Sequence, residues 1–344
     1  MDIDLLGQTA KAMVAAGQGI LAMDESTPTC GKRLQSVGVE NTEPNRIAYR
    51  ALLLGTPGLG DYISGAILYD ETIRQSNPDG IPFPELMKQQ DILIGIKVDS
   101  GAKDLALHGG EKITEGLDGL RERLEEYKTF GAGFCKWRAV ITIGKGLPSR
   151  ACMEANAHAL ARYAALCQEA GLVPIVEPEV LLDGDHSIDT CYQVTVETQR
   201  TVFEQLYRQG VHFEGMVLKP SMVLAAKDHA RPSTIQEVAE RTLECLQQTV
   251  PAAVPGIAFL SGGQTDEQAT RHLNTMNRLA QDLHLPWRLT FSYARALQHP
   301  ALETWRGEPG KVEAARKVLL QRARLNALAS KGEYREEMEQ QEAA

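Results

Sequence analysis

The stretch EGMVLKPSM, residues 214–222, joins an apolar run to a single lysine and then a proline. Residues 211–218 are predominantly apolar and predict a buried strand, which Lys219 closes and Pro220 stops. Burying an unpaired ammonium group costs several kcal/mol. Two interpretations of Lys219 follow: a structural ion pair with Glu177 or Glu179, or a reactive amine held at the end of a strand.

Apolar runs of the same kind recur along the whole chain, and each is short and bounded by Gly, Pro or charged residues. They cover residues 18–23, 62–68, 92–98, 132–141, 172–176, 213–218, 256–260 and 287–291. Helical patterns lie between them: one includes Leu117, Leu120, Leu124 and Tyr127, and another is expected to be capped by Ser233.

This alternation predicts a parallel sheet covered by helices. Eight repeats favour an α/β fold of the (β/α)₈ TIM-barrel type, with an open doubly wound sheet as the alternative. We expect one domain over residues 1–344, with a short, charged and mobile tail from about residue 332.

Composition restricts the possible partners and location. The net charge is −9 and no block of Lys and Arg stands out, so nucleic acid is not an expected partner. No apolar run approaches a membrane span, and the first residues, MDIDLLGQTAKAM, lack the pattern of a signal peptide. Six scattered Cys fit reduced thiols. We expect a cytoplasmic protein, or one of the plastid stroma if a transit peptide has been removed.

Polar residues lie at the C-terminal ends of seven of the eight predicted strands, where a TIM barrel places its chemistry. They are Asp24-Glu-Ser26, Lys97-Val-Asp99, Lys136-Trp-Arg138, Glu177-Pro-Glu179, Lys219, Ser261-Gly-Gly263 and Ser292-Tyr-Ala-Arg295. Residues two apart on a strand share a face, so Lys136 and Arg138 point together and Trp137 points away. The sequence therefore predicts one cation-rich barrel mouth that binds an anionic substrate with spaced charges.

Two of these segments suit a phosphate group. The Gly262-Gly263 turn can present free backbone N–H groups to an anion, and Arg295 offers bidentate contact to the same anion. Near such cations, desolvation and like charges disfavour the ammonium form of Lys219. A neutral amine can attack a carbonyl carbon and form a Schiff base.

With these residues the sequence resembles class I fructose-bisphosphate aldolase, the Schiff-base type. The similar segments run in order from about residue 17 to 330: GILAMDEST, CGKRLQSVGVENTEPNR, YISGAILYDET, GIKVDSG, FCKWRAVITIG, PIVEPEVLLDGDH, EGMVLKPSMV, AFLSGGQ and LTFSYARALQ. The pairing of EGMVLKPSMV with PIVEPE is specific to this family, and MDES followed by CGKR is closer to its plastid and cyanobacterial branch.

The resemblance implies a lyase that cleaves fructose 1,6-bisphosphate reversibly to dihydroxyacetone phosphate and glyceraldehyde 3-phosphate, in glycolysis, gluconeogenesis or the Calvin cycle. It implies a (β/α)₈ homotetramer that needs no cofactor or metal. Lys219 would form the Schiff base and Glu177 would be the general acid/base, with Asp24, Lys136 and Glu179 assisting. The implied phosphate and hydroxyl ligands are Ser261, Gly262, Gly263, Ser292 and Arg295 at the 1-phosphate, and Arg33, Lys97, Ser26, Arg46 and Arg138 elsewhere.

Two positions depart from the family pattern. Ala294 stands where Gly is common, which is tolerable unless a positive φ is required there. The tail ends EMEQQEAA, and the last tyrosine is Tyr334, whereas many members end in a Tyr that exchanges the enamine proton. Which group reprotonates the enamine is therefore left open.

Four alternatives stay open at this point. A metal-dependent aldolase would need clustered His, yet the eight His show no close pairing. Another Schiff-base barrel lyase, such as a transaldolase, would not need two separated phosphate sites. Sedoheptulose 1,7-bisphosphate is a second plausible substrate. A non-catalytic scaffold would be expected to lose catalytic residues, and Lys219, Glu177, Lys136 and Asp24 are all present.

Overall fold

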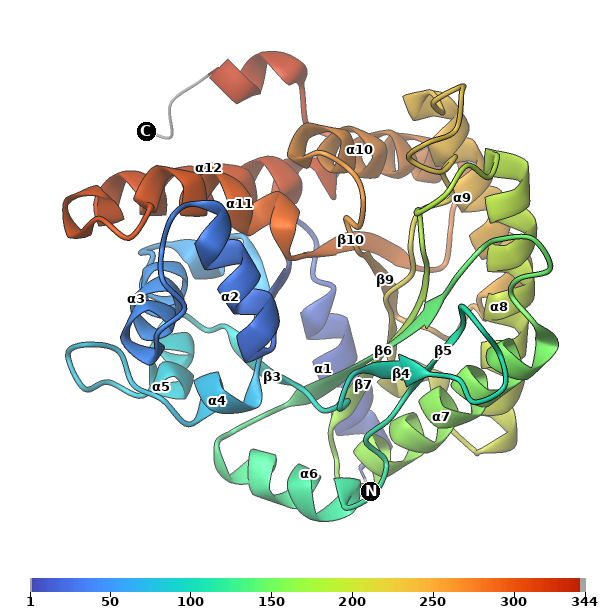
Figure 1. Cartoon of the computed structure of the whole chain (residues 1–344), viewed down its shortest axis with the longest axis horizontal. Helices are drawn as coiled ribbons and strands as arrows, with labels where there is room; N and C mark the ends of the chain where they lie inside the picture. Colours follow the sequence, from blue (N-terminus) through green and yellow to red (C-terminus); the bar gives the residue numbers. More distant parts are fainter. Residues whose placement is uncertain (1, 341–344) are drawn as a thin grey trace.

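The computed structural model describes residues 2–340, and within that range eight parallel strands close into a barrel. In order around the barrel they are β1 (Gly19–Ala22), β2 (Ile63–Leu68), β3 (Leu93–Lys97), β6 (Phe134–Ile141), β7 (Val173–Val180), β8 (Val217–Leu218), β9 (Gly256–Phe259) and β10 (Arg288–Tyr293). Each of the eight apolar runs overlaps one of these strands, although β7 and β10 extend past the end of their runs. The closed ring confirms the (β/α)₈ barrel and excludes the open sheet (Figure 1).

The strand expected over residues 211–218 is much shorter than predicted. Phe213–Gly215 forms a 3₁₀ turn, and regular pairing in β8 is confined to Val217 and Leu218. Gly215 lies close against the first helix, where an added Cβ would come within 2.9 Å of the Leu6 side chain. Because the chain packs on that helix here, it cannot extend as a strand until Met216. Backbone pairing continues one step beyond β8, since the Lys219 N–H donates to the Val176 carbonyl at 2.8 Å.

Helices surround the barrel in the described range (Figure 1). Their bounds are α1 (Ile3–Met13), α2 (Thr27–Ser36), α3 (Glu43–Leu54), α4 (Asp70–Ile73), α5 (Phe83–Lys88), α6 (Leu120–Thr129), α7 (Arg150–Glu169), α8 (Ile188–Arg208), α9 (Ile235–Thr249), α10 (Asp266–Leu283), α11 (Arg295–Trp305) and α12 (Val312–Ala329). Helix α6 begins only at Leu120, so Leu117 precedes it and packs against the core from the loop.

The prediction that Ser233 caps a helix is wrong by one residue. Thr234 is the N-cap of α9 and forms a capping box with Glu237, in which each side chain accepts from the other residue's backbone N–H. A capping box satisfies two helix N–H groups that would otherwise lack partners. Ser233 has another function, because its hydroxyl accepts the Ala225 N–H at 2.9 Å.

Helix α1 closes the N-terminal end of the barrel (Figure 1). Its apolar face, which includes Leu6 and Met13, packs with inward-facing strand residues in one buried cluster. Phe134 fills the space beside two strand glycines, and a Cβ at Gly95 would come within 2.2 Å of its ring. The closely packed lower barrel leaves the C-terminal mouth as the open end.

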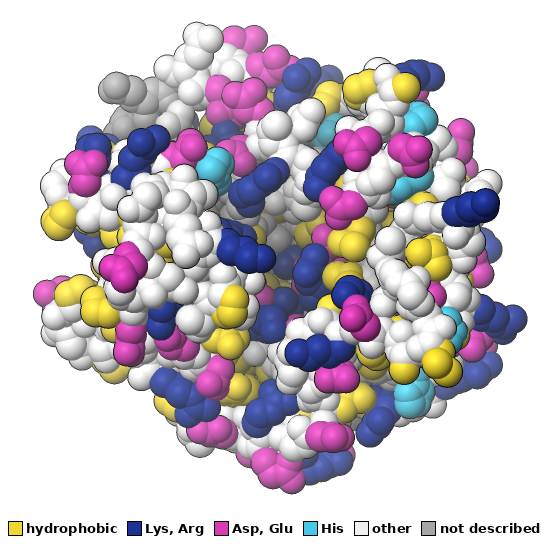
Figure 2. All heavy atoms as spheres, in the orientation of Figure 1, with side chains coloured by type: hydrophobic (Ala, Val, Ile, Leu, Met, Phe, Trp, Pro, Cys, Tyr) yellow, Lys and Arg dark blue, Asp and Glu magenta, His cyan; other side chains and the backbone are white. Residues whose placement is uncertain are grey.

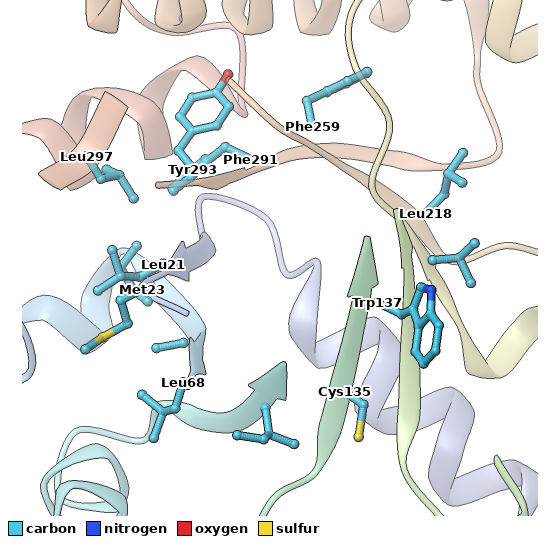
Figure 3. Packing of buried hydrophobic residues seen from close by; sticks show 14 of the residues in the cluster. Leu21, Met23, Leu68, Cys135, Trp137, Leu218, Phe259, Phe291, Tyr293 and Leu297 are labelled. Atoms are coloured by element: carbon cyan, nitrogen blue, oxygen red, sulfur yellow. The ribbon is translucent and has the colours of Figure 1, made fainter. Parts of the chain in front are cut away.

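The strand side chains that alternate with the inward-facing ones point outward and pack between the strands and the helices (Figure 3). Trp137 and Val98 belong to this outer layer and are fully buried there, as the two-residue alternation predicts. Trp137 stacks in a tilted arrangement on Tyr163 of α7, with ring centroids 5.5 Å apart. The outward layer is therefore apolar, and the inward layer becomes polar only at the strand ends.

Two further features surround this core. A two-stranded antiparallel hairpin, β4 (Ala102–Asp104) and β5 (Lys112–Thr114), follows β3 and was not anticipated from the sequence. In the described part of the tail, Arg322 of α12 contacts both carboxylate oxygens of Glu339 at 2.8 and 2.6 Å. Residues 341–344 of the predicted mobile tail lie outside the described residues. Among residues 2–340 no helix is long and apolar enough to cross a membrane.

Candidate active site

The predicted polar strand ends meet at one cavity of about 580 Å³ in the C-terminal mouth of the barrel. Figure 2 shows this face hollowed at its centre, with Lys and Arg side chains around the hollow. All but one of the fifteen predicted site residues line the cavity: Asp24, Ser26, Arg33, Lys97, Lys136, Arg138, Glu177, Glu179, Lys219, Ser261, Gly262, Gly263, Ser292 and Arg295. Strand parity places Lys136, Arg138, Glu177 and Glu179 on the inward faces of β6 and β7. Others, such as Ser26, Arg33 and Arg295, lie in the loops and helices that follow the strands.

Arg46 is the exception, and the structure places it outside the cavity. It lies on α3, and its guanidinium contacts both carboxylate oxygens of Glu71 at 2.9 and 2.6 Å and the Asn41 side chain at 2.9 Å. These contacts hold it between the outer helices. The structure therefore does not place Arg46 with the other predicted ligands, and its substrate contact stays a prediction.

Lys219 lies at the bottom of the cavity with only 4% of its surface exposed. Its Nζ is 3.3 Å from Glu177 Oε1, so the ion pair considered from the sequence forms with Glu177. Glu177 is itself buried, and its other oxygen is 3.5 Å from the Lys136 Nζ. One carboxylate therefore bridges two buried amines, which places a proton acceptor beside a candidate nucleophile.

Lys136 is held by three carboxylates. Its Nζ is 2.7 Å from Asp24 Oδ2, 3.5 Å from Glu177 and 3.8 Å from Asp99. Burial disfavours its charge, but Asp24, Glu177 and Asp99 together raise the pKa of Lys136 well above the ordinary value. For Asp24, burial opposes the charge in the same way, and Lys136, Lys219 and Lys97 outweigh it and lower the pKa. The pair is therefore ionised at neutral pH.

Asp99 was noted at a strand end but not predicted as a site residue, and it connects two of the lysines. Its carboxylate is 2.7 Å from the Lys97 Nζ and accepts the backbone N–H groups of Gly101 at 3.1 Å and Arg138 at 3.2 Å. Its side chain is almost fully buried. The two-residue spacing from Lys97 was the sequence signal that could have identified it. Beside it, Arg138 forms an ion pair with Glu179.

Glu25 also escaped the sequence analysis, because it lies between two predicted site residues in the segment Asp24–Ser26. One of its oxygens is 2.6 Å from Arg33 and the other is 2.6 Å from Arg50. Gln298 of α11 donates to Glu25 at 3.0 Å. Burial opposes ionisation of Glu25, but Arg33 and Arg50 outweigh it and lower the pKa. Glu25 thus orients Arg33 toward the cavity from a buried ion-pair network.

The part of the cavity that follows β9 and β10 has the features expected of a phosphate subsite. Gly263 has φ +77°, a conformation that glycine adopts readily, and a Cβ on Gly262 would come within 3.0 Å of Glu179. The Ser292 hydroxyl is buried and has no hydrogen-bond partner among the described residues. Ala294 has φ −101°, so the methyl group that departs from the family pattern causes no backbone strain.

Tyr334, the last tyrosine, lies away from the cavity. Its phenol donates to Glu339 at 2.9 Å, and its backbone N–H donates to Asn274 of α10 at 3.0 Å. Burial and Glu339 raise the pKa of Tyr334. In this arrangement the Tyr334 hydroxyl is held within the tail.

Comparison with known proteins gives a consistent result. Residues 5–344 match the family profile described as fructose-bisphosphate aldolase class-I. A "Probable fructose-bisphosphate aldolase class 1" of Xanthomonas campestris is 59% identical over 97% of this chain and 100% of its own length. "Fructose-bisphosphate aldolase 3, chloroplastic" of Arabidopsis thaliana is 51% identical over 99% of this chain and 86% of its own.

A solved structure has the same fold. It is the fructose-bisphosphate aldolase of Plasmodium falciparum, crystallised with TRAP and a small-molecule inhibitor. It shares 49% identity, covers 97% of this chain and 96% of its own, and superposes with a TM-score of 0.95.

Fold and site together define a (β/α)₈-barrel lyase with a buried lysine. The chain belongs to the class I fructose-bisphosphate aldolase family, the Schiff-base, metal-independent type. Its relatives include chloroplastic forms, as the resemblance to the plastid branch implied.

Proposed function

We propose that this chain cleaves fructose 1,6-bisphosphate reversibly to dihydroxyacetone phosphate and glyceraldehyde 3-phosphate through a Schiff base on Lys219. The observation that carries the proposal is the buried Lys219 beside Glu177, in a cavity lined by candidate anion ligands that follow several different strands. Binding both phosphate groups would hold the reacting carbons over the lysine, which is an orientation effect.

The first half of the reaction uses Lys219 and Glu177. The neutral amine of Lys219 attacks the C2 ketone, and Glu177, 3.3 Å from the Nζ, transfers protons as the carbinolamine loses water. The protonated iminium that results withdraws electrons from C3. The C3–C4 bond then breaks, its electron pair forms the enamine, and the C4 hydroxyl loses its proton as the aldehyde forms.

The proton from the C4 hydroxyl passes to a carboxylate, either Glu177 or Asp24. The charged Lys136 lies between these two groups, at 2.7 Å from Asp24 and 3.5 Å from Glu177. It stabilises negative charge that develops on the substrate oxygens in a site with little water. Protonation of the enamine and hydrolysis of the iminium then release dihydroxyacetone phosphate and regenerate Lys219.

The two phosphate groups are assigned to two sets of cavity residues. Ser261, Gly262, Gly263, Ser292 and Arg295 hold the 1-phosphate, supported by the unpartnered Ser292 hydroxyl and the positive φ of Gly263. Arg33, Lys97, Ser26 and Arg138 bind the other phosphate or the sugar hydroxyls. Glu179 assists by its ion pair with Arg138.

Release of triose phosphates, followed with coupling enzymes, tests this function. We expect cleavage of fructose 1,6-bisphosphate, and the same rate after treatment with a chelator. No cleavage of that sugar, or loss of activity on chelation, contradicts the proposal. The ratio of kcat/KM for sedoheptulose 1,7-bisphosphate to that for the fructose substrate measures the second candidate activity.

The proposed assembly is a homotetramer, and the proposed location is the cytoplasm, or the plastid stroma where a transit peptide is removed. The bacterial and chloroplastic relatives support these two locations. Light scattering during size-exclusion chromatography tests the assembly. A mass of one chain contradicts it.

A further inference from the structure

Tyr69 lies at the strand end for which the sequence suggested no site residue. It directly follows β2 and lines the same cavity as the predicted residues. Ile67, two residues earlier, belongs to the inward-facing cluster of the barrel. Because residues two apart on a strand share a face, Tyr69 continues the inward face of β2 into the mouth.

The neighbours of Tyr69 follow from the strand register. Strand β2 lies between β1 and β3, with Ile67 level with Ala22 and Leu68 level with Ile96. Continued by one or two residues, this register places Tyr69 level with Asp24 on one side and Lys97 on the other. Ser26, just past Asp24, lines the same cavity. Tyr69 therefore stands between Asp24 and Lys97, and Lys97 and Ser26 are both assigned to the substrate end away from the 1-phosphate.

The hydroxyl group of Tyr69 is available to a ligand. The side chain is half-buried, and its hydroxyl makes no hydrogen bond to any of residues 2–340. Burial, together with the carboxylates of Asp70, Glu71 and Asp99, raises the pKa of Tyr69. The phenol is thus a proton-bearing donor at neutral pH, suited to an anionic oxygen.

The position of Tyr69 across the barrel from Lys219 indicates which end of the substrate Tyr69 contacts. Strand β2 is four strands from β8 in either direction around the ring, so it faces the Lys219 strand directly. Strands β9 and β10 precede the 1-phosphate ligands and follow β8 around one side of the ring, with β9 next to β8 and β10 next to β9. A sugar joined to Lys219 at C2, with its 1-phosphate held there, extends its far end toward the wall of β2 and β3.

We propose that Tyr69 is a specificity-determining residue, which donates a hydrogen bond to the phosphate at the far (C6) end of the sugar, beside Lys97 and Ser26. This inference rests on the proposed function and deepens it. The residue does not act on the reacting carbons. It contributes to the preference for a sugar with two phosphates over one that carries only the 1-phosphate.

The test compares Tyr69→Phe with the unaltered enzyme on fructose 1,6-bisphosphate and fructose 1-phosphate. We expect kcat/KM for fructose 1,6-bisphosphate, divided by kcat/KM for fructose 1-phosphate, to fall about 10- to 100-fold in Tyr69→Phe. This is the effect of removing one hydrogen bond to a charged group. Product inhibition by glyceraldehyde 3-phosphate is expected to weaken by a similar factor, relative to inhibition by dihydroxyacetone phosphate. Tyr62→Phe, at the other end of β2, is the matched control and is expected to leave both ratios unchanged.

Each outcome has a defined meaning. An unchanged ratio in Tyr69→Phe, whether both activities persist or both fall together, overturns the inference and leaves the proposed function standing. Failure of the unaltered enzyme to cleave either sugar contradicts the proposed function instead. A change in the ratio in Tyr62→Phe as large as that in Tyr69→Phe also overturns the inference, because the effect would then belong to the strand.

Discussion

Replacing Glu25 with Gln removes the charge that holds two arginines beside the active site. Arg50 has 2% of its side chain exposed, and Glu25 is its carboxylate partner, at 2.6 Å. Removing one partner of such a buried pair costs about 3–5 kcal/mol, because the remaining charge is left without compensation. For 344 residues the unfolding entropy is about 0.7 kcal/mol/K. The expected fall in Tm is therefore about 4–7 °C.

Differential scanning calorimetry at one protein concentration measures this fall. The control is Glu244→Gln. Glu244 forms an ion pair with Arg241, and the two side chains are 46% and 37% exposed. Removing such an exposed pair lowers the free energy of unfolding by at most about 1 kcal/mol. The pKa of Glu25 is lowered from 4.5 in the folded state, so its contribution is complete above that pH and is lost on acidification. A Tm for Glu25→Gln equal to that of the control refutes the reasoning.

Three further changes probe the site itself. Lys136→Met is expected to lower kcat by about 10²–10³-fold, because it removes the buried charge between Asp24 and Glu177 that stabilises developing negative charge; a normal kcat in the cleavage assay rejects this role. Asp24→Asn removes a carboxylate that raises the pKa of Lys136, so the alkaline limb of the kcat/KM profile should move to lower pH, and an unmoved limb is the contrary result. Tyr334→Phe is expected to leave kcat unchanged in steady-state assays, since that phenol is held by Glu339; a large fall would place Tyr334 in the reaction.

The barrel was predictable because its signal is local and repeated. Eight short apolar runs separated by helical patterns suffice to indicate parallel strands, and all eight proved correct in position. The length of β8 was not predictable, because the contact between Gly215 and α1 joins residues far apart in the chain. In the hairpin β4–β5, strand β4 is exposed and β5 is only three residues long, so neither has an apolar pattern that would identify it.

The site was predictable where the alternation of side chains along a strand alone decides which residues point into the cavity. Lys136 and Arg138 share the cavity, and Trp137 lies outside it, as a two-residue period requires. Arg46 and Glu25 show the limit of this reasoning. Both lie off the regular strands, so their partners depend on how the outer helices pack. Arg46 was predicted as a ligand and lies outside the cavity, whereas Glu25 was not predicted and lines it.

Covalent trapping tests the central claim most directly. The enzyme is incubated with fructose 1,6-bisphosphate and sodium borohydride, digested, and examined by peptide mass spectrometry, with a sample lacking sugar as the control. Reduction of the iminium should leave a stable adduct of dihydroxyacetone phosphate on Lys219, with concurrent loss of activity. An unmodified Lys219, or an adduct formed only on another lysine, contradicts the account.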